Sequence, residues 1–96
     1  MTRDLHPTEG ARYLLELSTD DGARATYRAT IFTPAAEHTT DVSLGDDGTV
    51  TLSASDAPAE LTTRLTSMTK LMAREASKRR DDGLPPWPAR ILRWRK

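Results

Sequence analysis

The apolar residues of this chain change their spacing once, near residue 56. From residue 11 to residue 54 they alternate with polar residues, which is the spacing of strands with one buried face. Beyond that point they recur at three- and four-residue intervals, the spacing of one helical face, at Leu61, Leu65, Met68 and Met72. The chain is therefore expected to form a sheet first and a helix afterwards.

Four segments carry the alternating pattern, and we expect strands at about residues 11–18, 23–33, 39–45 and 49–54. An Asp-Gly pair follows the first segment and another follows the third. Asp-Gly favours tight hairpin turns because glycine adopts positive φ without steric cost. Short connections favour pairing between strands that are neighbours in the sequence, so the pattern predicts a four-stranded antiparallel meander.

The helix is expected over about residues 57–82 and should end near Gly83, a residue type that suits the left-handed position after a helix. A sheet with one apolar face needs a cover, and this helix is the only long candidate. The predicted fold class is therefore α+β, with the meander covered on one face by one long C-terminal helix. A short Trp/Arg-rich tail follows.

The 96 residues fit a single small domain, of which 36% are hydrophobic. We expect a flexible N-terminal arm over residues 1–10, the α+β domain over residues 11–83 and a Pro/Trp/Arg-rich tail over residues 84–96. A domain of this size buries a small core. Contact with a partner, or with a second copy of the chain, would therefore bury apolar surface that the fold alone leaves exposed.

The tail contains both tryptophans of the protein. Trp87, Ile91 and Trp94 are spaced by four and three residues, so a short helix would place them on one face. A strand fits this segment less well, because alternation would place Ile91 on the same face as two arginines. We therefore expect a short helix or a docked extension, either folded back onto the domain or presented to a partner.

Charge is distributed unevenly along the chain. Residues 1–69 hold five basic and eleven acidic side chains, and residues 70–96 hold nine basic and three acidic ones. Tryptophan and arginine are frequent in the residues that dominate protein interfaces. The candidate interaction surface therefore combines the tail with the basic side of the helix: Trp87, Arg90, Ile91, Arg93, Trp94, Arg95, Lys70, Arg74 and Lys78.

These features favour a non-catalytic module that binds another protein, or associates with its own copy, through the C-terminal segment. The first alternative is a nucleic-acid-binding module that uses the basic residues 70–96, with tryptophan stacking on bases. The acidic remainder of the chain would repel phosphates, which weakens this alternative. A more distant alternative is association with an anionic membrane surface, for which tryptophan and arginine on a short helix are suitable.

Several other classes of function receive no support from the sequence. The chain has no cysteine, which excludes disulfides and thiolate chemistry. Its Gly, Ser and His residues form no phosphate-binding, hydrolase or metalloprotease motif. His38 stands near Glu37 and Asp41, but one histidine with two carboxylates is a poor metal site. We expect no catalytic residue, cofactor, metal or small-molecule substrate. With no signal-like start and no long apolar run, the expected location is the cytoplasm.

Overall fold

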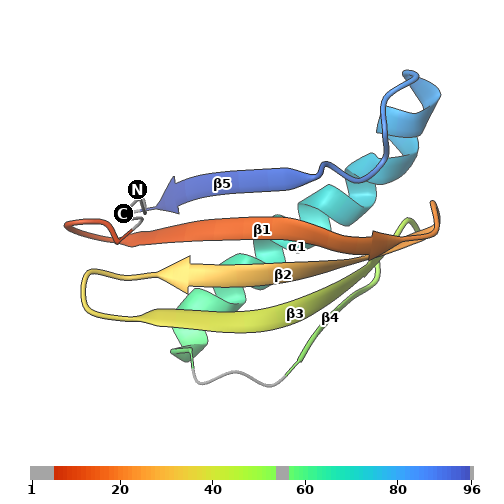
Figure 1. The fold of residues 1–96 in the computed structure, drawn as a ribbon. Helices are drawn as coiled ribbons and strands as arrows, with labels where there is room; N and C mark the ends of the chain where they lie inside the picture. Colours follow the sequence, from red (N-terminus) through yellow and green to blue (C-terminus); the bar gives the residue numbers. More distant parts are fainter. Residues whose placement is uncertain (1–5, 54–56, 96) are drawn as a thin grey trace.

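The structure is a computed structural model that describes residues 6–53 and 57–95. Within them the chain forms β1 (Ala11–Asp20), β2 (Arg24–Phe32), β3 (Glu37–Gly45), β4 (Val50–Leu52), α1 (Ala59–Asp81) and β5 (Arg90–Arg95). The strands form one antiparallel sheet in the order β4-β3-β2-β1-β5, and α1 lies across one face of it (Figure 1). The α+β class and the four-stranded meander are confirmed, and β5 adds a fifth strand.

Two hairpin turns set the register of the meander. In the first, Gly22 has a φ of 90°, and the Asp21 carboxylate accepts a hydrogen bond from the Arg24 backbone N–H at 2.8 Å. In the second, Gly48 has a φ of 91°. Both glycines occupy the left-handed region that other residues rarely adopt. The two Asp-Gly pairs therefore form turns, as the sequence predicts.

Alternate residues of the strands form the core beneath α1. The largest side chains that are fully buried are Tyr13, Tyr27, Leu15, Ile31, Leu44, Leu65, Val42 and Thr69. The apolar stripe predicted for the helix, Leu61, Leu65, Met68 and Met72, is called the Leu/Met stripe; it lies on this side, although it is not the centre of the buried face. Leu65, Thr69, Ala73 and Ala76 are buried, whereas Met68 and Met72 are partly buried at its side.

The helix ends just before Gly83, as the sequence predicts. Gly83 has a φ of 80°, its N–H donates to the Arg80 carbonyl at 3.1 Å, and the Leu84 N–H donates to the Arg79 carbonyl at 2.8 Å. This pair of bonds is the Schellman motif, which satisfies carbonyl groups that the end of a helix leaves without partners. The last turns of α1 project past the end of the sheet (Figure 1).

The tail does not form the short helix that its spacing suggests. Trp87 is buried and its flanking prolines are partly buried, and the chain then pairs with β1 as strand β5. Trp87 is only 3% exposed, and its indole N–H donates to the Gly22 carbonyl at 3.0 Å. The Tyr27 hydroxyl donates to the Pro88 carbonyl at 2.6 Å. The short-helix alternative was wrong because β1 offers a full edge of backbone hydrogen bonds, a tertiary effect that local spacing does not contain.

The described part of the N-terminal arm packs against the domain. Pro7 is buried, and His6 Nδ1 lies 2.7 Å from the Thr33 carbonyl oxygen. The His6 ring meets the Phe32 ring edge-on, with centroids 5.4 Å apart. The Trp94 indole N–H donates to the Glu9 carbonyl at 3.1 Å. Residues 6–9 therefore run beside the C-terminal ends of β2 and β5.

Candidate functional site

Strand β5 is an edge strand whose outer backbone groups face away from the sheet. The Leu17 N–H donates to the Ala89 carbonyl at 2.9 Å, which marks these residues as a hydrogen-bonded pair. Antiparallel pairs alternate, so the backbone groups of Arg90, Leu92 and Trp94 point away from β1. The Arg93 guanidinium donates to the Leu92 carbonyl at 3.0 Å, which agrees with that direction.

An open groove of about 410 Å³ runs between α1 and β5, and we call it the α1–β5 groove. Ile91 shares the helix-covered face of the sheet with its cross-strand partner Leu15, so its side chain points toward α1. The apolar side chains of the groove come from both elements and from the prolines between them: Met68, Leu71, Met72, Pro86, Pro88 and Ile91. Leu71 is 56% exposed, the largest exposed fraction among the exposed large apolar side chains of the described residues.

Arginine side chains surround this apolar floor. A second hollow of about 370 Å³ adjoins the groove and shares Met68, Leu71 and Arg95 with it. Together the two hollows are lined by five arginines: Arg64, Arg79, Arg90, Arg93 and Arg95. Glu75 is the one acidic residue in the lining. The groove therefore combines an apolar floor, a basic rim and an edge strand with outward backbone groups.

The structure divides the tail residues of the predicted interaction surface among three places. Trp87 lies in the core, so it does not belong to the candidate interaction surface in which the sequence analysis included it. Ile91 lines the α1–β5 groove together with the arginines of β5. Trp94 is 46% exposed and lies on the opposite face of the sheet, which its partner Arg12 shares. The tail residues therefore do not form a single aromatic face.

The basic side of the helix is separate from the groove. Lys70, Arg74 and Lys78 are exposed, and none of them lines either hollow. They follow one another at four-residue steps along a side of α1 that faces solvent. The structure therefore does not join the helix cations and the β5 arginines into one basic surface.

None of the five helix residues that line the groove was predicted as a site residue: Met68, Leu71, Met72, Glu75 and Arg79. The sequence contained one signal for them, because Leu71 stands beside the Leu/Met stripe and widens the apolar face beyond the width that the sheet covers. Their meeting with β5 depends on how α1 crosses the sheet, which is a property of the tertiary fold.

Across residues 6–53 and 57–95, no group of three or more His, Asp or Glu side chains is arranged to hold a metal ion. In the same part of the chain, no helix is long and apolar enough to cross a membrane. Comparisons with protein-family models, curated proteins and solved structures found no match to this chain. The geometry of the groove is therefore the basis for a functional proposal.

Proposed function

We propose that this protein is a non-catalytic binding module that takes an extended, acidic segment of a partner protein into the α1–β5 groove. The segment adds a strand to the sheet by pairing with the outer edge of β5. Strand addition draws affinity from backbone hydrogen bonds and specificity from pockets for alternate side chains. The observation that carries the proposal is the outward edge of β5 beside an apolar, arginine-rimmed groove.

The excess of positive charge in the groove favours an acidic partner segment. Five arginines and one glutamate line the two hollows, so acidic side chains in the partner would be attracted. The same arginines oppose pairing of β5 with β5 of a second copy, because like charges on neighbouring strands repel. Alternate side chains of the added strand would point toward Met68, Leu71 and Met72, so the partner segment should alternate acidic and apolar residues.

Binding can be tested with a fluorescently labelled peptide of alternating glutamate and valine, measured by anisotropy at low and physiological salt. We expect binding that weakens as salt rises, and no binding of a matched lysine–valine peptide. Leu92→Pro removes an outward N–H donor while leaving the bonds to β1, so it should abolish binding. Leu92→Ala keeps that N–H and is the matched control for loss of the side chain.

The electrostatic part of the proposal has its own pair of variants. Arg93→Glu changes a groove residue, and Arg74→Glu makes the same charge change on α1 outside the groove. Only Arg93→Glu should weaken peptide binding. Equal weakening by both variants, or binding by the Leu92→Pro variant, would contradict the proposal. Preferential binding of single- or double-stranded nucleic acid by the unmodified protein would favour the nucleic-acid alternative instead.

A further inference from the structure

The face of the sheet opposite α1 carries no helix within the described residues (Figure 1). Side chains paired across antiparallel strands share a face, so the register arranges this open face in rows across the strands. One row, which we call the charged row, runs from β5 through β1 and β2 to β3 as Arg90, Glu16, Arg28 and Asp41. Its charges alternate in sign at every step.

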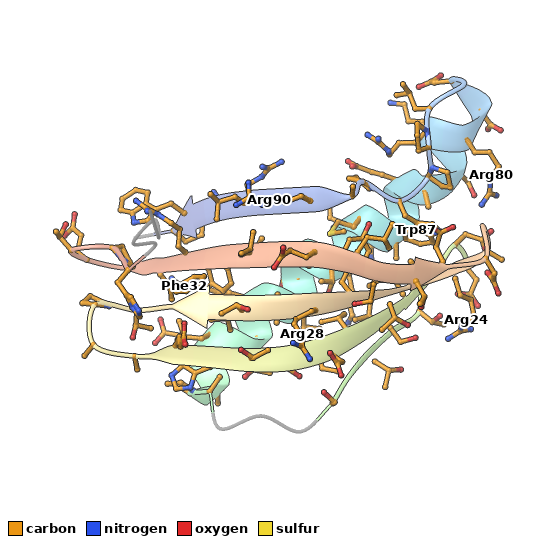
Figure 2. All side chains as sticks on the ribbon, viewed as in Figure 1. Arg24, Arg28, Phe32, Arg80, Trp87 and Arg90 are labelled. Atoms are coloured by element: carbon orange, nitrogen blue, oxygen red, sulfur yellow. The ribbon has the colours of Figure 1, made fainter. Side chains whose placement is uncertain are left out.

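All four side chains of the charged row are exposed, and Figure 2 shows Arg28 on the face of the sheet turned toward the viewer. Among the residues that the structure describes, the ion pairs within 4.0 Å are Arg64–Glu60 and Arg80–Asp46. Both lie outside the charged row. Its charges therefore stand opposite one another across the strands, and none of them forms an ion pair with another described residue.

The next row of the open face is mostly apolar or weakly polar: Leu92, Leu14, Thr30 and Thr39. Leu14 is only 7% exposed although no helix of the described residues covers it. At the far end of the face, His6 packs on Phe32, and the Glu9 carbonyl accepts the Trp94 indole N–H. The part of the face that remains open is therefore centred on the charged row and the Leu92–Leu14 row.

When a row of four alternating charges faces a copy of itself in reversed order, every position meets a charge of the opposite sign. A two-fold axis parallel to the strands, between β1 and β2, places Glu16 of one copy opposite Arg28 of the other. The same rotation places Arg90 opposite Asp41, so every contact along the row joins opposite charges. An axis across the strands would instead place each charge opposite itself, which like-charge repulsion disfavours.

We infer that the open face binds a second copy of this chain, with the two sheets facing each other about a two-fold axis parallel to their strands. Two sheets that pack face to face in this way keep their strands within about 30° of each other. The charges of the face are close to balanced, with four basic and three acidic residues: Arg12, Arg24, Arg28, Arg90, Glu16, Glu37 and Asp41. That balance fits a copy of the same face better than a polyanion.

This contact goes beyond the proposed function, because it uses the other face of the sheet. A peptide in the α1–β5 groove lies on the helix side of β5, and a second copy on the open face leaves that side accessible. Arg90 belongs to both surfaces, so the two proposals are separated by Glu16, Arg28 and Asp41, none of which lines the groove. Arg93→Glu should weaken peptide binding without changing the dimer, whereas substitutions in the charged row should act on the dimer.

The test is a charge reversal at facing positions, measured by sedimentation velocity at low salt. The unmodified protein should be a dimer that dissociates as salt rises. Glu16→Arg alone places two arginines opposite each other at both symmetry-related contacts, and Arg28→Glu alone places two glutamates opposite each other. Each variant should raise the dimer dissociation constant about tenfold or more. An equimolar mixture of the two should restore the dimer, because every facing pair in the mixed dimer is again opposite in sign.

Two further variants keep the test decisive if a central reversal disturbs the fold. Arg90→Glu and Asp41→Arg form the outer facing pair and should show the same loss and the same rescue on mixing. Arg74→Glu, on α1, is the control that should leave the dimer intact. Far-ultraviolet circular dichroism confirms that each variant is folded. A monomeric unmodified protein, a dimer that survives the single reversals, or a mixture that stays monomeric would overturn the inference.

Discussion

Tyr13 and Tyr27 are both fully buried beneath α1, but their hydroxyl groups meet different surroundings. The Tyr27 hydroxyl donates to the Pro88 carbonyl at 2.6 Å. The buried Tyr13 hydroxyl meets no partner in hydrogen-bond geometry among the described residues, although the Arg64 side chain lies close enough to lower its pKa against the larger effect of burial. A satisfied hydrogen bond contributes about 0.5–1.5 kcal/mol, whereas a buried polar group without a partner costs about 1–3 kcal/mol. The two hydroxyls should therefore affect stability with opposite signs.

Removing each hydroxyl in turn tests this contrast. Tyr27→Phe should lower the free energy of unfolding by about 1 kcal/mol, because the Pro88 carbonyl loses its donor. Tyr13→Phe should leave the free energy of unfolding unchanged or raise it, because the ring still fills its site and the buried hydroxyl is gone. Urea denaturation of the two variants and the unmodified protein measures both values. Equal destabilisation by the two substitutions would contradict the assignment of the hydrogen bond.

Tyr27 should also make stability depend on pH in alkaline solution. Burial raises the pKa of Tyr27 from 10.0 to about 12, and the nearby Asp20 carboxylate acts in the same direction. The folded state therefore holds the phenolic proton more tightly than the unfolded state. The resulting stabilisation is complete below pH 10 and is lost as the pH rises toward 12.

A shift of this size corresponds to at most about 3 kcal/mol. In urea denaturation across that pH window, the unmodified protein should lose stability more steeply than Tyr27→Phe. Burial also raises the pKa of Tyr13, but Tyr13 is present in both proteins and cancels from the difference. Parallel pH profiles for the two proteins would show that Tyr27 ionises as freely in the folded state as in the unfolded state.

The meander and the helix could be predicted because each buries one continuous face. In β2, Ala25, Tyr27, Ala29 and Ile31 are buried at alternate positions, and Asp-Gly turns mark two of the strand ends. The helix likewise carries an apolar stripe and a terminal glycine. Local pattern, turn chemistry and tertiary burial agree in these elements, so the pattern alone is sufficient.

Strand β5 could not be predicted in the same way because it is an edge strand with both faces partly exposed. Ile91 and Leu92 are adjacent in the sequence and point to opposite faces of the sheet, so no alternation appears. The helical spacing of the tail has an unrelated origin. Trp87 belongs to the core before β5 begins, and Trp94 lies on the open face.

The candidate groove shows the same limit. The sequence indicates that β5 is basic and that the helix has a wide apolar face. It does not indicate that Arg93 and Arg95 stand across from Met68 and Leu71. That arrangement depends on how α1 crosses the sheet and on β5 joining the edge next to β1. The basic side of α1 was visible in the sequence, but it faces solvent away from the groove.

The last segment of the chain completes the sheet and the core of the whole fold. The chain leaves the sheet at one edge after β4, crosses one face of the sheet as α1 and returns at the other edge as β5 (Figure 1). Strand β1 is thereby hydrogen-bonded along both of its edges, to β2 and to β5. Its pairing with β5 brings the N-terminal and C-terminal parts of the chain together. Residues 84–95 also supply Trp87 to the core and the Pro88 carbonyl to Tyr27. They act as a structural element of the domain in addition to forming the proposed binding edge.

Removing residues 84–96 should therefore cost the protein its cooperative unfolding transition. Loss of a buried tryptophan alone typically costs about 3–5 kcal/mol, against a total stability of about 5–15 kcal/mol for a domain. The truncation also removes the six-residue β5 and leaves β1 as an exposed edge. Trp94→Ala, which removes an indole that is 46% exposed, should retain the transition with a much smaller loss. Thermal unfolding followed by circular dichroism compares the two, and an unchanged transition in the truncated chain would mean that the tail is an appendage to a self-sufficient domain.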